Sequence, residues 1–152
     1  MPARVARSGS EYEDTIPALR YIEFQRDLQP PRSALIVDAD ESIRELLQSV
    51  LEVGGFEVRA VDDGEHAIAE LEAHRPDLLI TNLALQNMSG NELMGYVRAD
   101  RTLAGIPIMV VSGHLDVIRL DHEPDGVIHK PFDAQELLAC ARQLVDRSAD
   151  AA

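Results

Sequence analysis

The segment SALIVDADESIRELLQSVLEVGG, residues 33–55, contains the unit from which the fold can be predicted. Residues 33–37 form a short apolar run, which is typical of a strand buried on both faces. Apolar side chains at 43, 46, 47, 50 and 51 have the spacing of a helix that packs one face on a core. Gly54 and Gly55 predict the end of that helix. The segment therefore predicts a buried strand followed by a core-facing helix.

The alternation of strand and helix continues through the rest of the chain. Strands are predicted at 56–61, 77–81, 106–111 and 127–129. Helices are predicted at 64–75, 90–100 and 133–145, with a weaker helix at about 115–121. The last strong helix begins with a capping-box spacing, Asp133 and Glu136. Such an order predicts an α/β fold, a doubly wound, five-stranded parallel sheet covered on both faces.

The domain organisation is predicted as an extension, one α/β domain and a short tail. Residues 1–31 are the extension, with a disordered tail and a short helix at 15–28, and Pro30 and Pro31 follow that helix. The helix is expected to dock on its own domain or on a second molecule, because short isolated helices are marginal. Residues 32–147 form the domain and 148–152 the tail. With no room for a further output domain, output is expected through protein contact or self-association as a homodimer.

Composition narrows the classes of partner. The 152 residues have a net charge of −13, with 27 acidic and 14 basic residues. This balance predicts no contact with the nucleic-acid phosphate backbone and none with an anionic membrane. The single cysteine, Cys140, lies in an apolar helical stretch and is expected to be a core residue. No run approaches the ~18 apolar residues of a membrane span, so we expect a cytoplasmic protein.

Polar side chains follow four of the predicted strands. Asp38, Ala39 and Asp40 come after the first strand and Asn82 after the third. Ser112 follows the fourth strand and Lys130 the fifth. Carboxyl ends of parallel strands meet at one edge of a sheet, where α/β proteins bind ligands. Acids, a hydroxyl and a lysine at one edge would suit a phosphoryl group held through Mg²⁺.

Four motifs in the same order resemble the receiver domain of bacterial two-component response regulators. They are LIVDADESIRELL, PDLLITNLALQNMSGNEL, IPIMVVSG and HKPF, and the resemblance runs from about 33 to 145. It implies the flavodoxin-like receiver fold and a role in a phosphorelay rather than an enzyme activity. By the same resemblance, Ser112 and Lys130 match residues that contact the phosphoryl group.

Three positions depart from the family pattern. Asn82 matches the phosphoacceptor aspartate, and Ala39 replaces one acid of the turn that retains Asp38 and Asp40. Val127 matches an aromatic residue that reports phosphorylation. In the loop after Asn82, glutamine replaces the common proline. Together, these departures favour a naturally degenerate site over one engineered or deamidated residue.

The resemblance with its departures predicts a pseudo-receiver. A carboxamide is a poor nucleophile, and an acidic site reduced to Asp38 and Asp40 should bind Mg²⁺ weakly and stay unoccupied, so no cofactor is expected. The predicted function is a phosphorylation-independent protein interaction module, and a switch set by a small molecule or by pH is an alternative. Lys130 is expected to pair with Asp38 or Asp40. Ser112 is expected to bond to Asn82 or to backbone.

An enzyme of the haloacid-dehalogenase-like phosphatase class is the rival prediction. LIVDADES also fits its opening strand, with Asp38 as nucleophile, Asp40 as general acid, and Ser112 and Lys130 binding phosphate. That class needs a further acidic pair after the lysine, and here Asp133 is predicted to cap a helix instead. Three histidines near acids are interpreted as solvated loop residues rather than metal ligands: His114, His122 and His129.

Overall fold

A computed structural model of the chain describes residues 31–113 and 120–151. The strands are β1 (Ser33–Val37), β2 (Glu57–Val61), β3 (Leu78–Thr81), β4 (Ile108–Ser112) and β5 (Gly126–His129). The helices are α3 (Glu41–Val53), α4 (Gly64–Ala73), α5 (Gly90–Ala99) and α6 (Ala134–Ala151). Strand and helix alternate as the sequence predicts, and most boundaries agree within two residues.

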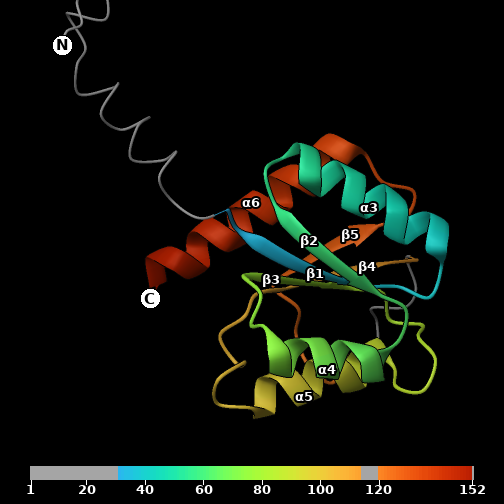
Figure 1. Cartoon of the computed structure of the whole chain (residues 1–152), viewed down its shortest axis with the longest axis vertical. Coiled ribbons are helices and arrows are strands. Elements are labelled where there is room, and N and C mark those ends of the chain that lie inside the picture. Colours follow the sequence, from blue (N-terminus) through green and yellow to red (C-terminus); the bar gives the residue numbers. More distant parts are fainter. Residues whose placement is uncertain (1–30, 114–119, 152) are drawn as a thin grey trace, which may run out of the picture. The chain divides into compact units, whose positions relative to one another are not determined.

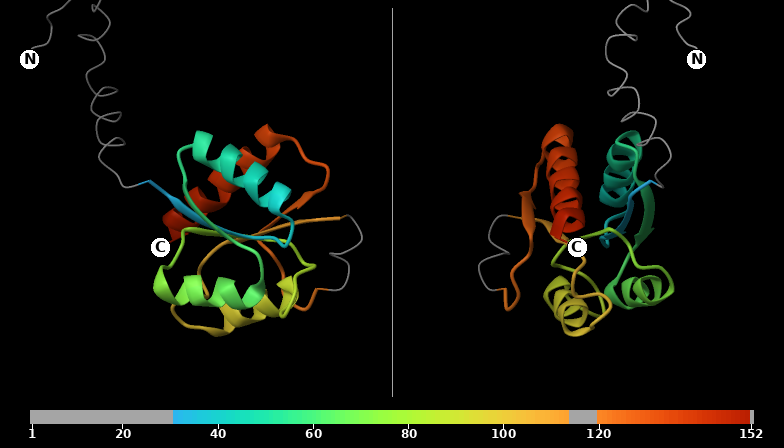
Figure 2. Two further views of the ribbon diagram at one scale, coloured as in Figure 1. Left: turned by 45° about the vertical axis from the view of Figure 1, so that its right-hand side comes forward. Right: turned by 90° about the vertical axis from the view of Figure 1, so that its left-hand side faces the viewer.

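The five strands form one parallel sheet in the order β2-β1-β3-β4-β5. Helices α3 and α6 cover one face of the sheet, and α4 and α5 cover the other (Figures 1 and 2). The chain moves outward from β1 to β2 and then returns to β3 on the other side of β1. The predicted doubly wound, five-stranded parallel sheet is therefore confirmed, with its switch point between β1 and β3.

The sheet separates two apolar clusters. Alternate residues of a strand point to opposite faces, so Ile36 of β1 packs under α3 and α6, whereas Leu35 packs toward α4 and α5. The first cluster includes Leu47, Leu51, Leu137 and Leu144, and the second includes Leu71, Leu93, Met94 and Val97. These side chains are at most 3% exposed. Burial on both faces explains why β1, β3 and β4 have uninterrupted apolar sequences.

The end of α6 and the location of the capping box differ from the sequence-based prediction. Helix α6 continues to Ala151, past the predicted end at 145 and into the segment that was predicted as a tail. No glycine or proline interrupts residues 146–151, so the backbone has no signal to stop. Asp133 accepts a hydrogen bond from the Gln135 N–H (2.9 Å), as a capping residue does. Among the described residues, the full capping box belongs to Ser89 and Glu92 of α5.

Some expectations fall outside the described residues. The helix predicted at 15–28 lies there, as do most of the helix at about 115–121 and His114, and the division of the chain at residue 31 stays a prediction. Among the described helices, none combines the length and the apolar character that crossing a membrane requires. Cys140 is half-buried on α6, and burial raises the pKa of its thiol above the ordinary value.

Candidate functional site

The carboxyl ends of the strands place the predicted site residues along one edge of the sheet. The backbone N–H of Asn82 donates to the Val37 carbonyl (3.0 Å), which ties the end of β3 to that of β1. The Lys130 N–H donates to the Ser112 carbonyl (3.0 Å), which ties β5 to β4. We call Asp38, Asp40, Asn82, Ser112 and Lys130 the rim. Parallel pairing brings these residues together although 92 positions separate the first from the last.

Asp38 and Lys130 form the ion pair of the rim. Asp38 is 1% exposed, and the Lys130 Nζ lies 3.5 Å from its Oδ2 atom. The other oxygen, Oδ1, accepts a hydrogen bond from the Asp40 N–H (2.9 Å). Oδ2 has no hydrogen-bond partner within the described residues. The buried carboxylate therefore depends on the ammonium group of Lys130 for compensation of its charge.

In the turn after β1, neither Asp40 nor Ala39 takes part in the described ion pair with Lys130. Asp40 is the N-cap of α3, and its Oδ1 accepts hydrogen bonds from the backbone N–H groups of Ser42 (2.8 Å) and Ile43 (3.3 Å). Ala39 is exposed and contributes no polar side chain. Of the two acids that the sequence offered as partners for Lys130, the described ion pair uses Asp38.

Asn82 and Ser112 direct their side chains to backbone groups of their own loops. The Asn82 Oδ1 accepts hydrogen bonds from the N–H groups of Leu83 (2.7 Å) and Ala84 (3.4 Å). Ser112 is fully buried, and its hydroxyl donates to the Gly113 carbonyl (3.1 Å). The backbone alternative expected for Ser112 is the one that the structure contains.

The other predicted residues do not join the rim. Val127 lies within β5, where it pairs with Val110, and is half-buried. His129 ends β5 opposite Ser112 and is exposed to solvent, so it belongs to the strand predicted at 127–129 and not to a loop. His122 is half-buried near Gly95, where a Cβ atom would lie 2.9 Å from the imidazole Nε2.

The loop between β3 and α5 is fastened to the beginning of α4, a contact that sequence reasoning missed. Asn87 has a positive φ of 69°, and its Nδ2 donates to the Asp63 Oδ2 (2.8 Å). Gly64 allows this approach, because a Cβ atom there would lie 2.6 Å from the Met88 Cβ. The consecutive residues Asp63 and Gly64 were the available signal, since aspartate followed by glycine marks a turn. The loop that follows Asn82 is thereby held on α4.

Comparison with known proteins agrees with this fold. A family model described as "Response regulator receiver domain" matches residues 34–142. The DNA-binding response regulator MtrA of Mycolicibacterium smegmatis is 34% identical over 120 residues, covering 76% of this chain and 51% of MtrA. The transcriptional regulatory protein GltR of Pseudomonas aeruginosa is 37% identical over 124 residues, covering 77% of this chain and 50% of GltR. The chain thus spans about half the length of these relatives.

Solved structures give the same result. A putative response regulator from Chloroflexus aurantiacus superposes with a TM-score of 0.74 and 30% identity, covering 78% of this chain and 100% of that one. The chemotaxis response regulator CheY4 of Vibrio cholerae superposes with a TM-score of 0.71 and 25% identity, covering 76% of this chain and 99% of CheY4. The flavodoxin-like receiver fold expected from the sequence is confirmed.

The curated relatives contradict the expectation that the protein has no nucleic-acid partner. MtrA is named a DNA-binding response regulator, and this chain is similar to about half of it. The expectation relied on a net charge of −13, which is a sum over the chain. Contact with DNA depends on where basic side chains gather rather than on their total. The exclusion drawn from net charge is therefore wrong.

Proposed function

Because this chain belongs to the response regulator receiver domain family of bacterial two-component signal transduction, we propose that it is a pseudo-receiver. In this proposal the domain transmits signals in the cytoplasm by binding protein partners, and aspartyl phosphorylation has no part in its cycle. In that case, the conformation of the surface that binds partners is determined by non-covalent contacts and not by a phosphoryl group.

The observation that carries the proposal is the internal pairing of the rim. Each side chain that would meet a phosphoryl group already contacts its own chain: Asn82 Oδ1 accepts from Leu83, Ser112 Oγ donates to Gly113, and Lys130 Nζ pairs with Asp38. A carboxamide is also uncharged and attacks phosphorus poorly, so Asn82 cannot supply the acyl phosphate that an aspartate supplies. The rim is consistent with a resting structure that needs no phosphoryl group.

The donors of the rim do not fit the Mg²⁺ ion that the family resemblance implies. Mg²⁺ prefers an octahedron of oxygen ligands, in which carboxylates supply the charge. The free oxygen of Asp38 faces an ammonium group at 3.5 Å, and Asp40 caps α3. The Ala39 side chain has no donor atom, and the Asn82 Oδ1 is engaged by backbone N–H groups. We therefore assign no step of the function to this metal.

The same geometry argues against the phosphatase alternative. Its nucleophile would be Asp38, whose side chain is 2% exposed and whose Oδ2 atom is enclosed by protein. An in-line attack requires the attacking oxygen to face the phosphorus atom of a substrate. The general acid would be Asp40, whose carboxylate accepts two hydrogen bonds at the start of α3. Neither acid is free for the role that this enzyme class would give it.

Phosphorylation from a small donor tests the proposal directly. Wild-type protein, Asn82→Asp, Ala39→Asp and the double variant would be incubated with acetyl phosphate and Mg²⁺ and examined by intact mass under neutral and acidic conditions. Only the double variant should gain substantial acid-labile phosphate, because it alone restores both the nucleophile and the second acid. An acid-labile mass gain at Asn82 of the wild type would disprove the proposal.

Two further outcomes are informative. If the double variant gains no phosphate while its fold is intact, the assignment of Asn82 and Ala39 to the reacting positions is wrong. Ser112→Ala in the double-variant background is the matched control, because it keeps the new acids and removes the hydroxyl. Partner capture from a bacterial lysate by the wild-type chain should be the same with and without acetyl phosphate. Capture that requires the donor would contradict phosphorylation independence.

A further inference from the structure

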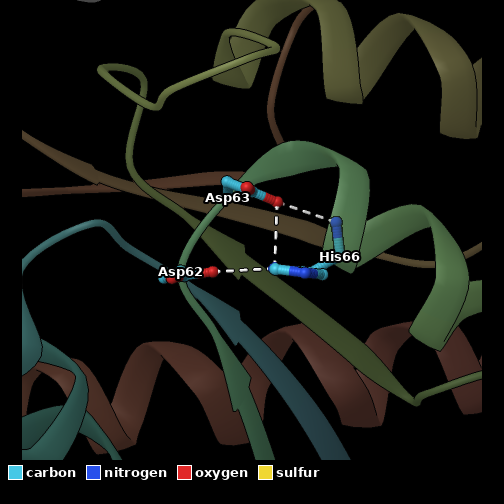
Figure 3. A group of neighbouring side chains, drawn as sticks. All are labelled: Asp62, Asp63 and His66. Carbon is cyan, nitrogen blue, oxygen red and sulfur yellow. Dashed lines mark hydrogen bonds and ion pairs between the residues drawn. The ribbon is translucent and has the colours of Figure 1, made fainter.

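Three potential metal ligands meet where β2 gives way to α4. Asp62 and Asp63 follow the strand, and His66 lies in the first turn of the helix (Figure 3). The His66 Nδ1 lies 2.9 Å from the Asp62 Oδ1 and 3.3 Å from the Asp63 Oδ1. One ligand atom from each residue lies within 4.8 Å of the other two. This cluster includes no residue of the rim.

The distances from the His66 nitrogen to the two carboxylate oxygens are compatible with ligands around a small divalent ion. With metal–ligand bonds of about 2.0–2.1 Å, two ligands of a tetrahedral ion lie about 3.3 Å apart. An angle of 90° between the same bonds brings the ligands to about 2.9 Å. The two nitrogen–oxygen distances in the cluster, 2.9 and 3.3 Å, match these values.

The surroundings hold one of the ligands in place and leave the other two open to solvent. Asp63 is the most restricted, because its Oδ1 accepts from the His66 N–H (2.8 Å) and its Oδ2 accepts from the Asn87 side chain (2.8 Å). Such outer contacts orient a ligating carboxylate. The side chains of Asp62 and His66 are 57% and 66% exposed, so an ion can reach them from solvent.

The ligand set selects the class of ion. Mg²⁺ and Ca²⁺ take oxygen ligands, whereas an imidazole nitrogen suits Zn²⁺, Ni²⁺ and Cu²⁺. Two carboxylates add the negative charge that a divalent ion requires. Three protein ligands leave a coordination position for water or for a group from another molecule.

We propose that Asp62, Asp63 and His66 form a binding site for a divalent transition-metal ion of the zinc type. The ion is held by Asp62 Oδ1, Asp63 Oδ1 and His66 Nδ1. Because Asp63 also binds Asn87, an ion at this site joins α4 to the loop that follows Asn82. The site is independent of the phosphorylation chemistry of the rim, so the two proposals can fail separately.

A proton competes with the ion for His66. The hydrogen bond to Asp62, reinforced by the charge of Asp63, raises the pKa of His66 above its ordinary value of 6.5. The same hydrogen bond lowers the pKa of Asp62, so that group stays a carboxylate. Protonation of His66 therefore competes with metal binding.

Titration calorimetry of the full chain with Zn²⁺ tests the site. His66→Gln removes the nitrogen ligand, and His74→Gln removes an exposed histidine at the other end of α4 as a matched control. We expect one equivalent of zinc that binds at least about tenfold more weakly in His66→Gln and with unchanged affinity in His74→Gln. Zinc binding that is as strong in His66→Gln as in wild type, or no saturable binding by wild type, would overturn the proposal.

Imidazole nitrogen signals distinguish the site from zinc bound elsewhere on His66. In ¹⁵N-labelled protein, zinc should shift the Nδ1 resonance of His66, and Mg²⁺ at the same concentration should not. Asp62→Asn keeps a side chain of the same size and should weaken zinc binding while thermal unfolding shows a folded protein. A zinc-dependent shift at Nε2 with Nδ1 unchanged would contradict the proposed coordination.

Discussion

At the scale of the residue, Asp38 occupies the most demanding environment described in the domain. A carboxylate that is 1% exposed loses most of its hydration, and its Oδ2 atom has no hydrogen-bond partner within the described residues. The Lys130 ammonium group at 3.5 Å supplies the compensating charge. Removing one member of a buried ion pair is more damaging than replacing both, because the remaining charge is left without a partner.

The first prediction concerns this pair. Lys130→Met should lower the free energy of unfolding by about 1–3 kcal/mol, since it leaves Asp38 buried and uncompensated. Arg101→Met, at an exposed position, is the control and should change stability by less than about 0.5 kcal/mol. Urea unfolding of both variants measures the difference. Equal stability of Lys130→Met and wild type would show that Asp38 has another source of compensation.

The second prediction concerns His66 in metal-free buffer. The hydrogen bond between His66 and Asp62 raises the pKa of the imidazole from 6.5 and lowers the pKa of the carboxyl from 3.8. The charged pair stabilises the fold fully between pH 3.8 and pH 6.5, the ordinary pKa values of the two groups. This stabilisation is lost as the pH rises through the raised folded pKa of His66, or falls through the lowered folded pKa of Asp62.

Thermal unfolding with a chelator present measures this effect. The melting temperature of His66→Gln should be below that of wild type near pH 5, and the difference should shrink as the pH rises toward about 9. A difference that grows with pH would reverse the sign of the effect and show that neutral imidazole is the stabilising form.

The sequence was sufficient to predict which residues form the rim, but not which contacts those residues make. The polar residues at the strand ends could be read from the sequence, because parallel strands bring their carboxyl ends together. The sequence could not show that Lys130 pairs with Asp38 and not with Asp40, because an aspartate at position 40 fits a metal site and a helix cap equally well. The cap is formed, and Asp40 accepts from two N–H groups of α3.

At the scale of the element, close backbone approach sets the boundary between β3 and α5. Gly90 begins α5 beside the end of β3, and its N–H donates to the Leu83 carbonyl (2.9 Å). A Cβ atom on Gly90 would overlap the Asn82 carbonyl oxygen and lie 2.8 Å from the Leu83 Cα. These neighbours are backbone atoms that cannot rotate away, so the position requires glycine.

The third prediction compares two glycines. Gly90→Ala should destabilise the protein by about 2 kcal/mol or more, because the loop after Asn82 must move. Gly105→Ala is the control, since its Cβ atom would meet only the Arg75 side chain at 3.6 Å, an ordinary contact. Chemical unfolding of the two variants gives the comparison. A tolerated Gly90→Ala would mean that the loop can shift at little cost.

Strands and helix cores were predictable at this scale, whereas helix ends were less so. The apolar runs of β1, β3 and β4 follow from burial on both faces, and periodic apolar residues identify α3. The helix predicted at 90–100 begins where α5 begins, but its Ser89–Glu92 capping box was not among the predicted features. Helix α6 extends further than predicted because its last turns contain neither the apolar stripe that marks a helix in the sequence nor a glycine or proline that would end it.

At the scale of the whole molecule, the 27 acidic residues outnumber the 14 basic residues. The net charge of −13 produces self-repulsion that opposes the compact state. The described ion pairs that offset it are mostly at the surface, for example Arg59 with Glu70 and Arg32 with Asp146. Exposed pairs of this kind contribute little each, whereas repulsion acts over the whole chain.

The fourth prediction follows from that imbalance. Increasing NaCl from about 0.01 M to about 0.3 M should raise the melting temperature by a few degrees, because salt screens repulsion among the excess acids. Scanning calorimetry measures the shift, and a neutral osmolyte at matched osmolality is the control. A fall in melting temperature with salt would show that the surface ion pairs outweigh the repulsion.

The internal hydrogen bonds of the rim have a consequence for the history of the chain. Asn82 and Ser112 bond to the backbone of their own loops, and the apolar clusters that stabilise the sheet include neither residue. Substitutions at Asn82 and Ser112, over evolutionary time as in the laboratory, are therefore expected to change the chemistry of the strand ends without removing the apolar core.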